Sequence, residues 1–287
     1  MLNLILSILS STSLFVIFKL SDRFKINTFN IIVINYIVAA LLGYSINQSP
    51  LSPNQIFSGN WLYLAVLIGI LFIIMFYFIG LSSQKAGISV TTVASKMSVI
   101  IPIAFSIAYY NESIGFLKIS GIIIAIIAVI LTVYKGKIES KSNQNILLPI
   151  ILFVGLGIGD SLVKFAQQEF VSNELSSIFT AILFTISGII GILASFFSKT
   201  TLRNFKDYRV YLVGILLGIT NFGSIYFLIN ALNSKILDSS VIFGINNIGI
   251  VALSIFIGFI IFKEKLSLIN WIGIMLSFGA LIILSNA

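Results

Sequence analysis

The most constraining feature of this 287-residue sequence is a succession of long, uninterrupted apolar runs. They fall at residues 2–20, 28–46, 61–83, 88–110, 116–134, 146–168, 174–197, 208–232, 237–262 and 268–285. An α-helix needs about 20 mostly apolar residues to cross a bilayer, and runs of this length fill nearly the whole chain. A β-barrel is disfavoured, because barrel strands alternate apolar and polar residues over about ten positions. We therefore expect an all-α integral membrane protein with ten transmembrane helices.

Composition supports this class and excludes others. Of all residues, 58% are hydrophobic and 9% are charged, whereas soluble domains have roughly 45–50% and about 25%. The net charge of +8 would suggest nucleic acid for a soluble protein, but these cations lie mainly between apolar runs, where they set topology. We expect the lipid bilayer as a partner and no nucleic acid. The chain has no Cys and no His, which removes the commonest metal and haem ligands, so no metal site and no cofactor are predicted.

The distribution of basic residues predicts the orientation in the membrane. Loops after the odd-numbered helices hold thirteen cations: Lys19, Arg23, Lys25, Lys85, Lys135, Lys137, Lys141, Lys199, Arg203, Lys206, Arg209, Lys263 and Lys265. The other loops hold three, which are Lys118, Lys164 and Lys235. Basic loops are retained on the cytoplasmic side. Both termini are therefore predicted to be extracytoplasmic in a multi-pass protein of the inner (plasma) membrane. The first run lacks a basic leader and a cleavage site, so it is predicted to be a span and not a signal peptide.

The two halves of the chain share a pattern. Adding 152 maps Glu112 onto Glu264 and Gly121 onto Gly273, while the offset is 145 between Lys19 and Lys164 and 150 between Lys85 and Lys235. Such internal similarity is typical of transporters built from structural repeats. A duplication of five helices, an odd number, places the second copy upside down. We expect two inverted five-helix repeats, residues 1–138 and 139–287.

The chain resembles the drug/metabolite transporter superfamily, specifically its EamA-like members. The resemblance rests on Asn111-Glu112-Ser113, on Lys263-Glu264-Lys265-Leu266, on the Gly nine residues beyond each Glu, and on the chain length. The resemblance covers essentially all residues. It implies a transporter of amino acids, drugs or other small metabolites, with a central cavity between two five-helix repeats. Recurrence of Glu112 and Glu264 in tight loops predicts a role in helix-end architecture.

Lys96 is the most informative single residue. It lies about nine residues inside the fourth run, which contains no acidic residue. A charge at this depth costs roughly 2.5–3.5 kcal/mol on insertion scales, so it must face a cavity or a partner. Two interpretations stay open: Lys96 faces substrate, or it is neutralised by a buried Asp or reaches an interface.

Offsets of 150–151 map Lys96 onto Asn246 and Asn247, two adjacent amides inside the ninth run. They are predicted to bind substrate or to hydrogen-bond between helices. Asp160 precedes Lys164 by four residues, a favourable spacing for a pair on one helix face; alternatively it pairs with Lys96 or transfers protons during transport.

Further candidates are weaker individually. Four polar residues at membrane depth are predicted to line the cavity: Asn35, Tyr77, Asn221 and Tyr226. Pro102 removes a backbone donor and predicts a kink that makes the fourth helix a moving gate. Gly155, Gly157 and Gly159 predict close helix packing.

The leading functional hypothesis is a secondary transporter of a small-molecule substrate, with a site between helices 1–4 and 6–9 and with helices 5 and 10 peripheral. A monomer is compatible with this plan. A lipid-head-group flippase of the same fold is the alternative. A membrane-embedded enzyme is disfavoured, because the chain lacks His and Cys and has only nine acidic residues.

Overall fold

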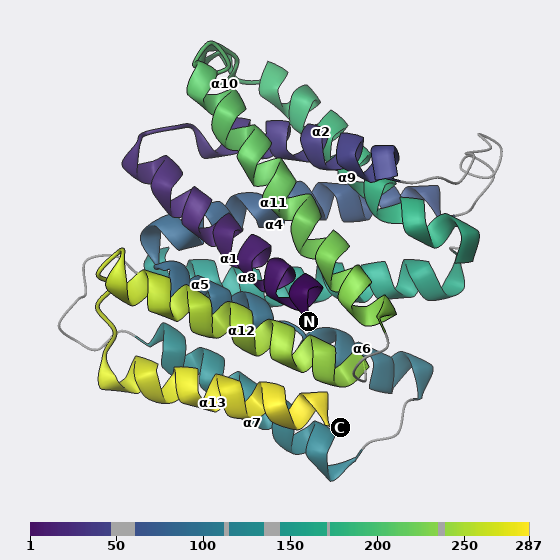
Figure 1. Cartoon of the computed structure of the whole chain (residues 1–287), viewed down its shortest axis with the longest axis vertical. Helices are drawn as coiled ribbons and strands as arrows, with labels where there is room; N and C mark the ends of the chain where they lie inside the picture. Colours follow the sequence, from purple (N-terminus) through teal and green to yellow (C-terminus); the bar gives the residue numbers. More distant parts are fainter. Residues whose placement is uncertain (47–60, 112–114, 135–143, 171–172, 235–238, 287) are drawn as a thin grey trace. The chain divides into compact units, whose positions relative to one another are not determined.

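The chain consists largely of long apolar helices. The computed structural model describes residues 1–46, 61–111, 115–134, 144–170, 173–234 and 239–286, and within them it is helical apart from short connections. The helices are α1 (Leu2–Arg23), α2 (Thr28–Ile46), α4 (Leu62–Lys85), α5 (Ile88–Met97), α6 (Ile100–Tyr110), α7 (Phe116–Val133), α8 (Gln144–Glu169), α9 (Asn173–Phe196), α10 (Lys199–Asn204), α11 (Tyr208–Asn233), α12 (Ser239–Ile260) and α13 (Leu268–Ser285) (Figure 1). Within these described ranges, ten spans are long and apolar enough to cross a membrane, with α5 and α6 counted together. The predicted multi-pass helical class is confirmed.

The helices group into two compact units. Unit 1 comprises Met1–Lys19, Phe78–Gly157 and Gly223–Ala287, and unit 2 comprises Leu20–Tyr77 and Ile158–Phe222. Each unit takes helices from both halves of the sequence. The grouping follows packing and does not test the boundary between residues 138 and 139, which stays a prediction.

In unit 1, α7 and α13 pack antiparallel. Each helix has a glycine near its start, and this glycine contacts the end of the other helix. A methyl group added at Gly121 would lie 2.6 Å from Cδ2 of Leu284, and one at Gly273 would lie 2.5 Å from the backbone nitrogen of Thr132. These contacts are reciprocal, because one offset of 152 relates Gly121 to Gly273 and Thr132 to Leu284. Glycine is needed here because the two helices approach too closely for a side chain.

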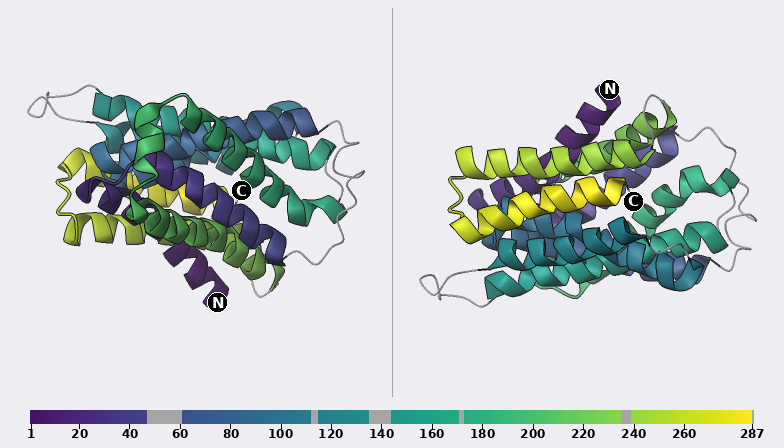
Figure 2. Two further views of the ribbon diagram at one scale, coloured as in Figure 1. Left: turned by 90° about the horizontal axis from the view of Figure 1, so that it is seen from above. Right: turned by 90° about the horizontal axis from the view of Figure 1, so that it is seen from below.

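The start of α13 is fixed to the end of α7 by a polar side chain. Nδ2 of Asn270 donates to the carbonyl oxygens of Leu131, Thr132 and Tyr134 at 3.2, 2.8 and 2.9 Å. Asn270 also forms a capping box with Ser267, so one residue satisfies the carbonyls at the end of one helix and the N–H groups at the start of another. α12 and α13 run side by side as a hairpin in all views (Figures 1 and 2).

In unit 2, α2 and α9 form a second antiparallel pair with the same kind of reciprocity. A methyl group added at Gly43 would lie 2.8 Å from Cβ of Ala181, and one at Gly191 would lie 2.9 Å from Cγ2 of Val33. An offset of 148 relates Val33 to Ala181 and Gly43 to Gly191. Both units therefore contain a pair of antiparallel helices that occupy the same place in the two halves of the sequence.

Unit 2 also contains a helix that the apolar runs do not predict. The short helix α10 connects α9 to α11, and Ser198 caps it by accepting from the backbone N–H of Thr201 at 3.3 Å. α10 has the sequence Lys-Thr-Thr-Leu-Arg-Asn, which is too polar and too short to cross a bilayer.

Candidate functional site

The fourth predicted span, residues 88–110, is broken into α5 and α6 at Ser98 and Val99. Pro102 has no N–H to donate to the residue four positions earlier, which is Ser98. The Ser98 carbonyl instead accepts from the N–H of Ile101 at 3.0 Å, a tighter bond of the 3₁₀ type. The Ser98 hydroxyl donates to the carbonyl of Ser95 at 2.7 Å. The break thus follows from the missing donor of Pro102.

Lys96 is two residues before this break and is half-buried. It is the one charged residue of α5 and α6. Hydroxyls on the same helix bond to their own backbone: Thr92 donates to the carbonyl of Ile88 at 2.9 Å, and Ser95 donates to that of Thr91 at 2.8 Å. The hydroxyl groups near Lys96 are therefore largely satisfied within α5, and the ammonium group is the only charge on this helix.

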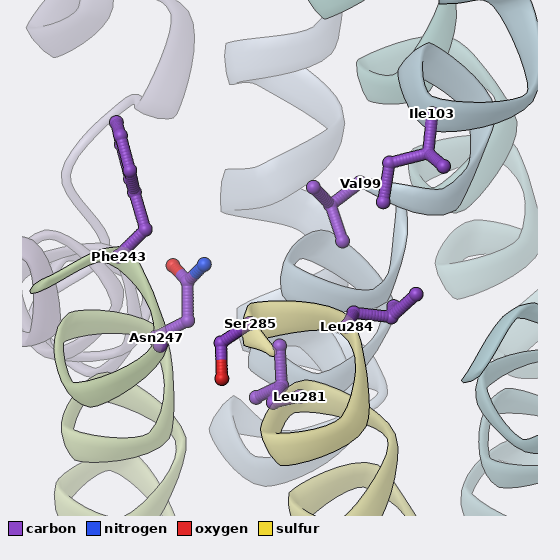
Figure 3. A pocket seen from close by; sticks show the side chains of 8 residues that line it. Val99, Ile103, Phe243, Asn247, Leu281, Leu284 and Ser285 are labelled. Atoms are coloured by element: carbon purple, nitrogen blue, oxygen red, sulfur yellow. The ribbon is translucent and has the colours of Figure 1, made fainter. Parts of the chain in front are cut away.

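A pocket of about 340 Å³ opens beside the break in unit 1. We call it the break pocket; its lining residues are Val99, Ile103, Phe243, Gly244, Asn247, Leu281, Leu284 and Ser285. Figure 3 shows the Asn247 amide on α12 and the Val99 side chain on opposite sides of the same hollow. Most of the lining is apolar, with the amide of Asn247 and the hydroxyl of Ser285 as the polar groups. Such a pocket fits a small molecule with an apolar body and few polar atoms.

Asn246 and Asn247 have different surroundings although they are neighbours. Asn247 is half-buried and lines the break pocket. Asn246 is only 3% exposed, and its Oδ1 has no hydrogen-bond donor among the described residues. A buried acceptor without a partner costs about 1–3 kcal/mol. An apolar side chain at position 246 would avoid this cost. The Asn246 amide is therefore a candidate for accepting a hydrogen bond from a ligand or from water.

Glu264, in the connection between α12 and α13, binds the N-terminus of α5. Its carboxylate accepts from the N–H of Ile88 at 2.5 Å, from the N–H of Ser89 at 3.1 Å and from the Ser89 hydroxyl at 2.8 Å. An anion is favoured at this end of a helix, where N–H groups are unpaired and the helix dipole is positive. The helix-end role predicted for Glu264 is confirmed.

The backbone around Glu264 is shaped for this contact. Gly87 has φ 104°, and a methyl group there would lie 2.9 Å from Oε1 of Glu264. Lys263, just before the glutamate, is left-handed with φ 53°, and Asn111, at the position related by the offset of 152, is left-handed with φ 51°. Glu112 itself lies outside the described residues.

Asn35 and Asn221, both predicted to line the cavity, lie together inside unit 2. Asn35 is fully buried, and with its amide nitrogen turned toward α11 it lies 3.2 Å from the carbonyl of Leu217 and 3.1 Å from Nδ2 of Asn221. The helices approach closely here, because a methyl group at Gly218 would lie 2.9 Å from the Asn35 carbonyl oxygen. The Asn35 amide thus donates to the Leu217 carbonyl and connects α2 to α11, as polar groups between membrane helices commonly do.

The two predicted tyrosines lie in aromatic surroundings. The ring of Tyr77 packs edge-on against Phe29 with centroids 6.2 Å apart, and that of Tyr226 against Phe227 at 5.4 Å. Both tyrosines are half-buried. Neither lines the break pocket.

The remaining candidates lie on α8. Asp160 is exposed and Lys164 is half-buried. Gly157 lies against the side chain of Ile101 in unit 1, and a methyl group at Gly159 would lie 3.3 Å from Cδ2 of Leu71 in unit 2. Gly155 is buried. Within the described residues, no group of three or more Asp or Glu side chains lies close enough to hold a metal ion.

Sequence reasoning missed most of the break pocket. Phe243, Leu281, Leu284 and Ser285 contribute to it, but apolar residues in a hydrophobic helix carry no distinguishing pattern. The tenth predicted helix, α13, was expected to be peripheral, yet its last turn lines the pocket. Two signals were available: Asn247, which the offset of 151 from Lys96 singled out, and Pro102, which predicted an interruption close by.

Comparisons with known proteins give a relative and a similar fold, and neither names an activity. No family model matches the chain. An uncharacterized protein of Haemophilus influenzae is 29% identical over 295 residues, which cover 97% of this chain and 96% of the relative. A solved crystal structure is similar over 97% of both chains, with a TM-score of 0.54 and 10% identity. At this identity the similarity concerns the fold alone.

Proposed function

We propose that this protein is a secondary transporter that moves a small metabolite across the inner (plasma) membrane by alternating access. The proposal rests on one observation: a hydrophobic span is broken at Ser98–Val99, two residues after the intramembrane cation Lys96. Ser98 and Val99 keep right-handed helical dihedrals, with φ −56° and −54°, so the break is a single turn of the 3₁₀ type. A 3₁₀ stretch inside a helix often marks a functional hinge, and transporters build binding sites near the midplane from interrupted helices.

The reciprocal helix contacts support an inverted repeat, which is the usual scaffold for alternating access. Under a two-fold relation, a contact from residue i to residue j recurs as a contact from the equivalent of j to the equivalent of i. The glycine contacts of α7 with α13 and of α2 with α9 follow this rule. With the loop motifs around Glu112 and Glu264, they favour membership of the drug/metabolite transporter superfamily, EamA-like branch.

We further propose that the substrate carries a carboxylate or another anionic group that Lys96 attracts. An ammonium group offers three donors and a localised charge, and its attraction for an anion is stronger in a low-dielectric site than in water. Lys96 is one helical turn before Val99, which lines the break pocket. Asn247 supplies a polar group in the pocket wall. Asn246, which is buried beside it and does not line the pocket, is proposed to use its Oδ1, unpaired among the described residues, when the site rearranges. Asp160 is proposed to pair with a lysine or to exchange a proton during the cycle.

Flux into liposomes tests this proposal. The purified chain, Lys96→Arg and Lys96→Met are compared at equal protein content with labelled anionic amino acids, cationic drugs and a fluorescent lipid. We expect anion uptake that the Arg variant retains in part and the Met variant loses by at least about tenfold, since one lost charge interaction of roughly 1.4 kcal/mol already gives that factor. Lipid movement without solute uptake would establish the flippase instead. Equal anion uptake by both variants would remove Lys96 from the site.

A further inference from the structure

Two connections far apart in the sequence meet in unit 2 and bring six basic side chains together. One connection joins α1 to α2, and the other runs through α10 to α11. They are joined by a hydrogen bond from Nδ2 of Asn30 to the carbonyl of Thr201 at 2.9 Å and by one from Nη1 of Arg209 to the carbonyl of Phe24 at 3.5 Å. We call the resulting surface the basic face: Arg23, Lys25, Lys199, Arg203, Lys206 and Arg209, all exposed.

Most of this positive charge is uncompensated. Arg209 forms an ion pair with Asp207, with 2.7 Å between Nη2 and Oδ2. Its hydrogen bonds hold the pKa of the Asp207 carboxyl below the usual value, so this pair is neutral overall at physiological pH. Of the six basic residues, only Arg209 has an acidic partner in the described part of the chain. The other five therefore attract anions.

Exposed aromatic side chains are interleaved with these cations. Phe24, Phe197 and Tyr208 are 58%, 92% and 71% exposed. Phe24 lies between Arg23 and Lys25, Phe197 is two residues before Lys199, and Tyr208 precedes Arg209. Aromatic rings gather at the boundary between headgroups and acyl chains, and cations beside them meet lipid phosphates. A soluble polyanion would account for the cations but not for the exposed rings.

We propose that the basic face binds anionic phospholipid headgroups, with α10 lying at the membrane interface. A polar pocket of about 160 Å³ adjoins the face and is lined by Lys25, Ile26, Asn27, Asn204, Asp207 and Val210. It is large enough for one headgroup phosphate. Its wall holds the ammonium of Lys25, two amides and the carboxylate of Asp207, whose charge Arg209 neutralises. This interaction goes beyond the orientation that the same cations determine, and it does not depend on the transport proposal.

Thermal unfolding and native mass spectrometry of the full chain in neutral detergent test the proposal. Phosphatidylglycerol is compared with phosphatidylcholine of the same acyl chains and with inorganic phosphate. The test variant combines Lys25→Gln, Lys199→Gln, Arg203→Gln and Lys206→Gln. The matched control neutralises four cations of unit 1 and combines Lys85→Gln, Lys118→Gln, Lys263→Gln and Lys265→Gln. A second variant, Phe197→Ser, removes a ring while keeping every charge.

We expect phosphatidylglycerol to raise the unfolding temperature of the parent and the control more than phosphatidylcholine does. In the test variant this difference should disappear, and bound phosphatidylglycerol should fall roughly tenfold or more, because each juxtamembrane cation contributes to the attraction. Phe197→Ser should weaken binding of the lipid with no change in its salt dependence. Equal responses of test variant and parent would overturn the proposal, and so would equal stabilisation by inorganic phosphate.

Discussion

Glu264 and Lys96 are both charged residues of unit 1, and their surroundings give them different roles. The carboxylate of Glu264 has three donors within 3.1 Å, all at the start of α5. Charge and hydrogen bonds are thus matched, which is the arrangement of a structural cap. Lys96, eight residues further along the same helix, is the only charge of the broken span. Glu264 therefore fixes the position of α5, whereas Lys96 is the residue of α5 that the proposed function uses.

Removing the carboxylate of Glu264 should destabilise the protein. Glu264→Ala leaves the N–H groups of Ile88 and Ser89 without this acceptor, and hydrogen bonds to charged groups contribute about 1.5–3 kcal/mol each. We expect a clear fall in the unfolding temperature in detergent, and a smaller fall for Glu264→Gln, which keeps one acceptor oxygen. Glu169→Gln, at the exposed end of α8, is the control. An unchanged unfolding temperature for Glu264→Ala would show that the cap contributes little.

Single residues differed in how far the sequence could predict them. Lys96 could be found because a charge within an apolar run is costly wherever it points. Glu264 could be found because it recurs with Glu112, but its partners on α5 lie about 175 residues away and no local pattern connects them. The sequence could not show that Oδ1 of Asn246 lacks a hydrogen-bond donor among the described residues, because this depends on packing. The neighbouring Asn247 has the same side chain but lines the pocket.

At the scale of helices, length and apolarity were sufficient to predict the ten spans. The predicted limits 28–46 and 268–285 coincide with α2 and α13, because a span ends where polar or turn-forming residues stop the helix in the membrane. The polar helix α10 was not predicted, because it lacks the apolar signal. Pro102 predicted an interruption of the fourth run, and the structure places that interruption four residues earlier, at Ser98.

Restoring a backbone donor at position 102 should slow transport without harming the fold. Pro102→Ala supplies an N–H toward Ser98 and removes a residue that is about 3 kcal/mol less favourable in a helix interior. We expect an equal or higher unfolding temperature, a several-fold lower maximal rate and a nearly unchanged KM in liposomes. Pro149→Ala, inside α8, is the control for proline removal in general. Full transport by Pro102→Ala would show that the break is not needed for movement.

The close approach of α7 and α13 predicts an asymmetry between two glycines of one helix. Gly273→Ala places a methyl group 2.5 Å from the Thr132 backbone nitrogen, which cannot rotate away, whereas nothing lies within 4 Å of a methyl group at Gly279. Overpacking typically costs about 1–3 kcal/mol. We expect Gly273→Ala to lower the unfolding temperature and Gly279→Ala to leave it unchanged or raise it slightly. Equal effects would mean that the helices separate easily.

At the scale of the whole molecule, contacts in the two units and offsets in the sequence agree. Sequence matches require 145 for the first helices, 150 for the third and 152 for the last two. The reciprocal contact of α2 with α9 requires 148, and that of α7 with α13 requires 152. The offset thus increases along the chain, as small insertions between matching helices would produce. Few side chains are identical between the halves at these offsets, so the proposed repeat is supported mainly by the packing contacts.

Both termini should lie outside the cytoplasm. Ten spans place the two ends of the chain on one side, and thirteen cations against three assign the odd-numbered loops to the cytoplasm. We expect a reporter active only outside the cytoplasm to function when fused after Ala287, and a reporter active only in the cytoplasm to be silent there. Fusion after Lys141, in a connection with three of the thirteen cations, should give the opposite result and controls for expression. Cytoplasmic activity at Ala287 would reverse the orientation. The basic face would then lie on the outer surface, where the cytoplasmic retention of basic loops does not explain six cations together. The antiparallel helix pairs would be unaffected.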